Sequence, residues 1–478
     1  MAGNVERKGS VGWVLASLAL CMLLPSLGTS IANVALPTLA ESLGASFQQV
    51  QWVVLAYLLA TTTLIVGVGR LGDITGRRRL LLTGIVLFTA ASSLGSVASG
   101  LWLVIAARAA QGLGAAVMLA LSMALVGEAV PKTRTGSAMG LLGTMSAVGT
   151  ALGPTLGGIL IAGFGWQAIF LVNVPLGLMA LVLAHSYLPP DGPSSEADRT
   201  GFDGVGTLLL ALTLASYALA MTMGRGRFGP VNIALLLAAA LGVGLFVLVE
   251  ARAASPLIRL TSFRDPVLSA SLAMSALVST VVMATLVVGP FYLARGLGLE
   301  PALVGIVMSA GPVIAAFTGV PAGRLVDRLG AERMTVGGLA GMVVGCSVLS
   351  VAPASLGIAG YLIPIALLTA GYALFQTANN TAVMAEVSPD QRGVVSGVLN
   401  LSRNLGLITG ASVMGAVFAL AAGAGDFGAA RPEAVATGMR VTFAVAAALV
   451  VVALVIAGAS VALSGSGRRA GGRDRIVA

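Results

Sequence analysis

Long apolar stretches alternate with short polar segments along almost the whole chain. A helix needs about 20 mostly apolar residues to cross a membrane. By that criterion the pattern predicts fourteen spans, near 13–35, 50–69, 80–97, 102–125, 136–162, 168–188, 204–224, 228–249, 266–293, 302–323, 334–351, 358–382, 393–420 and 439–463. An even number of spans places both ends of the chain on the same side of the membrane.

An internal repeat groups these spans. The pattern G-R-L-x-D-x-x-G follows the second span at Gly69 and recurs at Gly323, an offset of 254 residues. We therefore expect an all-α polytopic membrane protein with a pseudo-twofold repeat of two six-helix bundles and two inserted helices. The predicted parts are an N-terminal bundle in 1–190, a linker with two transmembrane helices in 191–265, and a C-terminal bundle with a cytoplasmic tail in 266–478.

Composition and charge support a membrane location. Apolar residues make up 57% of the chain and charged residues 9%, whereas soluble domains carry about 25% charged residues. Of the 27 basic residues, 20 lie on the side of the chain ends and 5 on the other, and two, Arg108 and Arg403, fall inside spans. This bias predicts a multi-pass membrane protein with both termini cytoplasmic. The net charge of +9 is therefore explained by membrane topology. The expected partner of the basic residues is the lipid bilayer and not nucleic acid.

Two segments carry the repeated pattern. The first consists of Gly69, Arg70, Gly72, Asp73, Gly76, Arg77 and Arg78, and the second of Gly323, Arg324, Asp327 and Gly330. Asp73 is expected to precede a helix, where its carboxylate would accept N–H bonds and oppose the helix dipole. The alternative is an ordinary positively charged inner loop.

Span 5 carries a run of small residues, Gly140, Gly149, Gly153, Pro154, Gly157 and Gly158. Glycines four residues apart share one helix face and allow close helix contact, and Pro154 can bend the helix. We expect a tight, bendable contact between the two halves. Ordinary close packing is the alternative.

These segments resemble signatures of the major facilitator superfamily, and within it the fourteen-span drug:proton antiporter family. The resemblance covers almost the whole chain and implies two bundles that rock around a central cavity and give alternating access. It implies that the segment after span 2 latches one conformation and that span 5 holds the antiporter signature. It also implies that Arg108 and Gln111, in Arg108-x2-Gln111-Gly112-x-Gly114 of span 4, take part in proton coupling. An arginine that snorkels to the membrane surface is the alternative.

Polar and titratable groups inside spans are the remaining candidates. The candidates for lining the substrate cavity are Asn33, Tyr57, Asn173, Gln376, Asn379, Asn400 and Arg403. Many such groups only form hydrogen bonds between helices. The titratable groups that could carry a proton near the inner half are Asp73, Glu128 and His185.

The chain departs from the antiporter family at one position in span 1. The family signature usually reads L-D-x-T-x-x-N-x-A-L-P, and here Gly28 stands where the family has its acidic residue. None of the 18 acidic residues lies mid-span, whereas Arg108 and Arg403 do. We therefore expect neutral, zwitterionic or anionic substrates in preference to quaternary ammonium compounds.

The function predicted from these features and from the resemblance is proton-coupled export of drugs or small organic molecules. The exporter is expected to be a secondary transporter of the bacterial inner membrane that works as a monomer. A G-x4-G-K-[ST] segment is missing, which disfavours an ATP-driven pump. Two cysteines and one histidine offer no metal site, no cofactor is expected, and an enzyme is disfavoured. A specific exporter of a metabolite, natural product or anion, and a non-transporting membrane sensor, are the alternatives.

Overall fold

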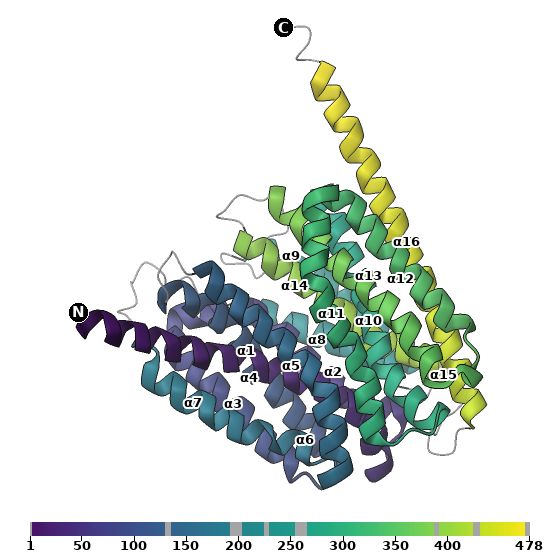
Figure 1. Ribbon diagram of the computed structural model, residues 1–478, viewed down its shortest axis with the longest axis horizontal. Helices are drawn as coiled ribbons and strands as arrows, with labels where there is room; N and C mark the ends of the chain where they lie inside the picture. The colour runs from purple at the N-terminus through teal and green to yellow at the C-terminus, as the bar shows by residue number, and fades with distance from the viewer. Residues whose placement is uncertain are drawn as a thin grey trace.

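The computed structural model describes residues 2–129, 135–191, 203–223, 229–253, 265–386, 392–423 and 431–473. For Arg70, Asp73, Glu128 and Gly140 the structure describes only the helical backbone, and not what surrounds the residue. All regular elements of the described ranges are helical (Figure 1). Thirteen of the described helical segments are long and apolar enough to cross a membrane. The prediction of an all-helical polytopic membrane fold is confirmed.

The first bundle occupies the lower left of Figure 1 and contains seven helical pieces. They are α1 (Ala2–Ser42), α2 (Phe47–Thr75), α3 (Arg77–Ser96), α4 (Leu101–Ala129), α5 (Thr135–Phe164), α6 (Ala168–Leu171) and α7 (Asn173–Tyr187). The predicted span 168–188 is thus a short helix followed by a longer one. We call the side on which α1 begins the inner side, and the opposite side the outer side.

Two inserted helices, α8 (Gly204–Thr222) and α9 (Pro230–Glu250), follow the first bundle. Helix α8 is hydrogen-bonded to both bundles near its outer end. The indole of Trp52 on α2 donates to Thr222 at 3.0 Å. The hydroxyl of Tyr217 donates to Thr409 of the last bundle at 3.2 Å. Helix α9 packs on α8 and leaves large aliphatic side chains exposed, as lipid-facing helices do.

The last bundle lies at the upper right of Figure 1. Its helices are α10 (Pro266–Phe291), α11 (Pro301–Leu329), α12 (Ala331–Val351), α13 (Gly357–Glu386), α14 (Arg392–Thr409), α15 (Gly415–Ala421) and α16 (Pro432–Arg473). A π-helical turn, η4 (Tyr292–Gly296), ends α10, and a second, η7 (Gly410–Met414), joins α14 to α15. A 3-10 turn, η5 (Ala354–Leu356), precedes α13.

The predicted repeat is visible in the backbone. Helices α2 and α11 both have 29 residues and begin 254 positions apart, at Phe47 and Pro301. Each ends at a glycine with positive φ, +95° at Gly76 and +89° at Gly330, which also begins the next helix. Because residues with a side chain rarely adopt such a φ, glycine is needed at both junctions.

Candidate transport site and gates

One arginine lies deep in the first bundle, held by oxygens from three helices. Arg108 on α4 is 1% exposed. Its Nε donates to the carbonyl of Val53 at 2.9 Å, and its Nη1 donates to the carbonyl of Gly28 at 3.1 Å and to Gln111 Oε1 at 3.0 Å. The guanidinium lies 4.2 Å from the ring centre of Tyr57, a cation–π contact. The alternative of a snorkelling arginine is therefore wrong.

No acidic side chain of the described residues pairs with this guanidinium. The Nη2 of Arg108 is buried and has no hydrogen-bond partner there. An intramembrane charge is costly, and such a residue usually faces a partner or a cavity. Within the part of the chain that the structure describes, the guanidinium therefore has no acidic counter-ion.

Gly28 occupies the place from which a carboxylate would reach Arg108. A Cβ on Gly28 would lie 4.0 Å from Nη1 of Arg108 and 3.4 Å from Cζ of Phe88. An aspartate at this position would thus place its carboxylate within ion-pair reach of the guanidinium. In this chain the backbone carbonyl of Gly28 is the acceptor instead.

The glycines after Arg108 allow α4 to approach its neighbours. A Cβ on Gly112 would lie 2.5 Å from the carbonyl oxygen of Tyr57 on α2, and a Cβ on Gly114 would lie 2.7 Å from that of Gly84 on α3. Gln111 donates to Ser92 on α3 at 2.6 Å. These contacts fix the rotation of α4 and hold Arg108 against α1 and α2.

The residues of the first bundle that were predicted to line the substrate cavity are buried and hydrogen-bonded to nearby backbone carbonyls. Asn33 and Asn173 are each 1% exposed, and each donates to a carbonyl one turn earlier, of Thr29 at 3.2 Å and of Ile169 at 3.0 Å. The side-chain oxygen of each asparagine has no hydrogen-bond partner in the described part. Tyr57 donates to a carbonyl of α1 at 3.0 Å and lies at the Arg108 site.

The candidates of the last bundle differ in exposure. Asn379 is buried and lies 3.4 Å from the carbonyl of Ser271, to which it donates. Gln376 and Arg403 are half-buried, and Asn400 is exposed. Asn400 and Arg403, three residues apart, lie on neighbouring faces of α14, whose other side packs on α10. The described contacts bring no candidate of this bundle into the Arg108 site.

The segment after span 2 is organised differently from the prediction. Asp73 lies in the last turn of α2, which ends at Thr75, and the N-cap of the following helix α3 is Gly76. The carboxylate at the start of α3 belongs to Asp191, which accepts the backbone N–H groups of Arg78 at 2.7 Å and Arg79 at 3.2 Å. The Arg78 guanidinium donates to the carbonyl of His185 at 2.6 Å.

The physical need for Asp191 can be seen in the sequence of α3. This helix begins with three arginines, Arg77 to Arg79, at an end where the helix dipole favours negative charge. Its N-cap, Gly76, has no side chain to accept an N–H bond. Asp191, four residues after the end of α7, supplies both the acceptor and the negative charge, and no local sequence pattern pointed to it.

Two residues of the second latch segment and one proton-carrier candidate lie at the surface. Arg324 and Asp327 of the second segment are exposed, and so is the side chain of His185. A Cβ on Gly69 or Gly323 would meet nothing within 4 Å. The glycines that open both segments therefore leave free space on the inner side.

Three glycines of span 5 pack within the first bundle. A Cβ on Gly149 would lie 2.5 Å from the carbonyl oxygen of Leu23, and one on Gly157 would lie 2.8 Å from Cγ1 of Ile31, both on α1. A Cβ on Gly153 would collide with Ser30 of the same helix. The prediction that the run joins the two halves is therefore wrong for these three positions.

Gly158 makes the predicted contact between the halves. A Cβ here would lie 2.6 Å from the carbonyl oxygen of Pro301 and 3.0 Å from Cα of Gly305, both on α11. A Cβ on Gly305 would in turn collide with the carbonyl oxygen of Pro154. Helices α5 and α11 thus touch backbone to backbone toward their outer ends.

A second contact between the halves closes the outer side around α2. The ring of Phe47 lies 4.7 Å from that of Phe291 on α10 and 5.4 Å from that of Phe418 on α15. At the rim, Glu41 and Arg295 form an ion pair of 2.9 Å. We call these residues, with Gln48 and Gln51 of α2, the outer gate. Sequence reasoning missed this gate because its parts are far apart in the chain.

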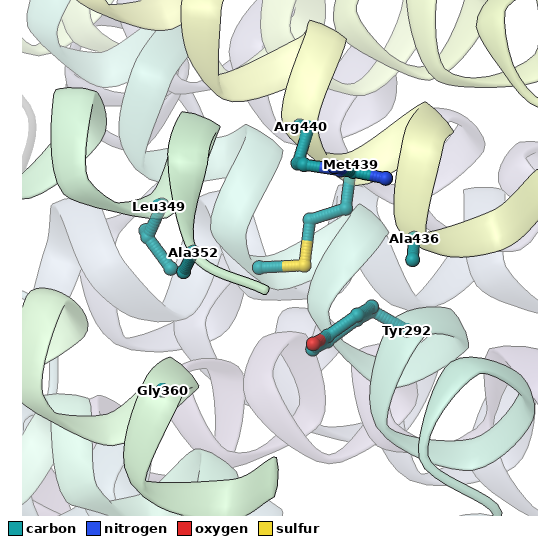
Figure 2. A pocket seen from close by; sticks show the side chains of 7 residues that line it. All are labelled: Tyr292, Leu349, Ala352, Gly360, Ala436, Met439 and Arg440. Atoms are coloured by element: carbon teal, nitrogen blue, oxygen red, sulfur yellow. The ribbon is translucent and has the colours of Figure 1, made fainter. Parts of the chain in front are cut away.

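A small cavity at the outer end of the last bundle is a separate feature. Its volume is about 10 Å³, room for about one water molecule. Figure 2 shows the thioether of Met439 and the ring of Tyr292 entering it from different helices, with Arg440 at its edge. It is too small for an organic substrate, and no group of three or more metal-ligating side chains occurs in the described residues.

Comparisons with known proteins agree with this architecture. The chain matches the model of the Major Facilitator Superfamily over residues 18–411. It is 34% identical over 377 residues to the multidrug resistance protein Stp of Mycobacterium tuberculosis, covering 77% of this chain and 69% of Stp. It is 29% identical over 371 residues to the riboflavin transporter RibZ of Clostridioides difficile, covering 78% of this chain and 80% of RibZ.

Among solved structures, the fold is similar to that of a bacterial homologue of the human lysosomal transporter Spinster. The TM-score is 0.68 at 16% identity, over 94% of this chain and 97% of the other. The chain belongs to the major facilitator superfamily, and the predicted resemblance is confirmed. It is therefore a multi-pass membrane protein and a secondary transporter of a small molecule, not an enzyme.

Proposed function

We propose that this transporter exports neutral, zwitterionic or anionic small organic molecules, drugs among them, by proton-coupled alternating access. The proposed substrate class rests on Arg108, which has no acidic partner among the described residues and whose acceptor on α1 is the backbone carbonyl of Gly28. An aspartate in place of Gly28 would neutralise the guanidinium and favour cations. Without it, a cation entering the first bundle meets a positive charge.

Export of drugs is supported by the relative Stp, which is named a multidrug resistance protein. We place the chain in the bacterial plasma membrane with both termini cytoplasmic, because basic residues concentrate on the inner side. Counting the 29-residue α2 as a span gives fourteen, arranged as the bundles 1–190 and 266–478 with the linker 191–265 between them. Each monomer contains both bundles and is proposed to act alone.

Proton coupling is assigned to groups near the inner half, because span 1 has no acid. Asp73, Glu128 and His185 are the proposed carriers. Arg108 and Gln111, which are hydrogen-bonded to each other, are proposed to take part in proton coupling by responding to the proton or to the bound substrate. Substrate is proposed to contact Asn33, Tyr57 and Asn173 in the first bundle and Gln376, Asn379, Asn400 and Arg403 in the last.

The segments Gly69–Arg78 and Gly323–Gly330 are proposed as latches of the inner side. Free space around Gly69 and Gly323 supports this, because the segments can come together when the inner side closes. Asp191 is proposed to hold the first latch in shape by binding the start of α3. The glycine run of span 5 is proposed to serve antiport through its contact with α11 at Gly158.

The test is transport by purified protein in proteoliposomes with an imposed pH gradient. We expect the gradient to drive movement of an anionic or neutral organic dye. Collapsing the gradient with a protonophore should stop it, and so should the triple variant Asp73→Asn, Glu128→Gln, His185→Gln. Dye movement that ignores the gradient, or that survives in the triple variant, would refute the proposed coupling.

A specific metabolite exporter is the second candidate function. It is favoured by the relative RibZ, which is named a riboflavin transporter, and by the fixed geometry of the buried Arg108 site. A competition assay, in which other compounds inhibit transport of the dye, distinguishes a broad exporter from a specific one. A broad exporter lets many unrelated anionic and neutral compounds inhibit dye transport, whereas a specific exporter responds to one chemical family.

A further inference from the structure

Two buried glutamines of α2 lie beside the apolar contact that closes the outer side, and one of them, Gln51, reaches across it. Gln48 and Gln51 stand in the first turns of α2, three residues apart on one side of the helix, next to Phe47. Gln48 is 5% exposed and Gln51 1% exposed. Phe47 packs against two phenylalanines of the last bundle. Purely apolar side chains would fill such a contact more favourably.

The amides of these glutamines are poorly satisfied in the closed gate. Neither the oxygen nor the nitrogen of the Gln48 amide has a hydrogen-bond partner in the described part, and neither does the oxygen of Gln51. A buried amide without partners has lost its bonds to water and gained none in return, which is a penalty to the closed state. Opening the gate to water removes that penalty.

The single bond of Gln51 crosses between the bundles. Its Nε2 donates to the carbonyl of Ala411 at 2.9 Å. Ala411 lies in the π-helical turn η7, where the regular hydrogen-bond pattern of the helix is interrupted. A Cβ on Gly415, the first residue of α15, would collide with the Gln51 amide, so glycine allows this close approach. The bond must break when α2 and α15 separate.

We propose that Gln48 and Gln51 form a polar wedge that keeps the outer gate reversible. The three phenylalanines, the ion pair at the rim and the Gln51–Ala411 bond hold the gate closed. The unpartnered amide atoms offset this stabilisation, because they gain water only when the gate opens. The balance lets the same gate close after release of substrate and open again. The wedge acts on the conformational equilibrium and does not depend on the identity of the substrate.

The test measures the gate directly, without any substrate. Cys21 and Cys346 are replaced by alanine, and spin labels are attached at Ser42→Cys and Glu300→Cys, exposed positions at the outer ends of the two halves. Pulsed electron resonance in lipid nanodiscs then gives the populations of closed and open outer gates. Gln48→Leu removes the unpartnered amide at similar size, and we expect the open-to-closed ratio to fall about tenfold.

A second variant moves the gate the other way. Gln48→Glu places a more strongly hydrated group at the same site, and we expect the open population to rise. A rise can be measured even if the outer gate of the starting protein is almost fully closed. Gln167→Leu, an exposed glutamine at the outer end of the first bundle, is the matched control and leaves the ratio unchanged. The proposal is overturned if Gln48→Leu opens the gate, or if both Gln48 variants leave the distances unchanged.

Discussion

Arg108 Nη1 donates a 3.1 Å hydrogen bond to the carbonyl of Gly28, at the position where the antiporter signature has an acidic side chain. A backbone carbonyl carries a partial charge and cannot be protonated at physiological pH. It therefore orients the guanidinium without neutralising it and cannot carry a proton. The substrate preference proposed for this chain follows from that exchange of a carboxylate for a carbonyl.

The geometry of the Arg108 site predicts that lysine cannot replace arginine. Lysine keeps the charge but lacks the planar fork that reaches Val53, Gly28 and Gln111 together. We expect Arg108→Lys to destabilise the protein by about 2 kcal/mol, through loss of charged hydrogen bonds, and to reduce transport. Thermal unfolding in detergent and proteoliposome transport measure both. Arg431→Lys, at an exposed arginine just before α16, is the control, and a loss as large there would argue against a special site at Arg108.

Asp191 is predicted to stabilise the start of α3. Removing the acceptor in Asp191→Ala leaves the N–H groups of Arg78 and Arg79 without it, and we expect a loss of about 1 kcal/mol. Asp191→Asn keeps an acceptor but removes the charge, so its loss should be smaller. Equal stability of all three proteins in thermal unfolding would show that the cap is without effect.

Neighbouring glycines of span 5 are predicted to have different roles. Gly158→Leu forces α5 away from α11, so the outer ends of the bundles should separate. Overpacked contacts cost about 1–3 kcal/mol, and transport should fall by the corresponding factor of about 5 to 160. Gly157→Leu presses on Ile31 inside the first bundle and should lower thermal stability without opening the outer side. Spin-label distances across the outer gate distinguish the two variants. Identical distances in both would refute the assignment.

The sequence predicted the features that depend on local composition. Apolar length located the spans, and the repeated G-R-L-x-D-x-x-G pattern located two junctions with the same backbone conformation at Gly76 and Gly330. The Arg108 site was also predictable in part, because a charge inside an apolar span needs partners. What the sequence could not show was which backbone oxygens those partners are.

Features that depend on how helices face each other were missed. Asp191 lies 113 positions from Arg78 along the chain, so its cap on α3 becomes apparent only in three dimensions. The faces of the glycine run were misassigned for a similar reason. A small-residue stripe predicts close packing but not the partner helix, and here α1 and α11 pack on different faces of α5.

The central claim, that an uncompensated Arg108 selects against cations, is tested most directly by restoring the acid. Proteoliposome transport of ethidium and of an anionic dye is compared for the wild type, Gly28→Asp and the neutral control Gly28→Asn. We predict that the wild type and Gly28→Asn move the anionic dye and not ethidium, and that Gly28→Asp loses anion transport and gains ethidium transport. Ethidium transport by the wild type under a pH gradient, or an unchanged preference in Gly28→Asp, would contradict the claim.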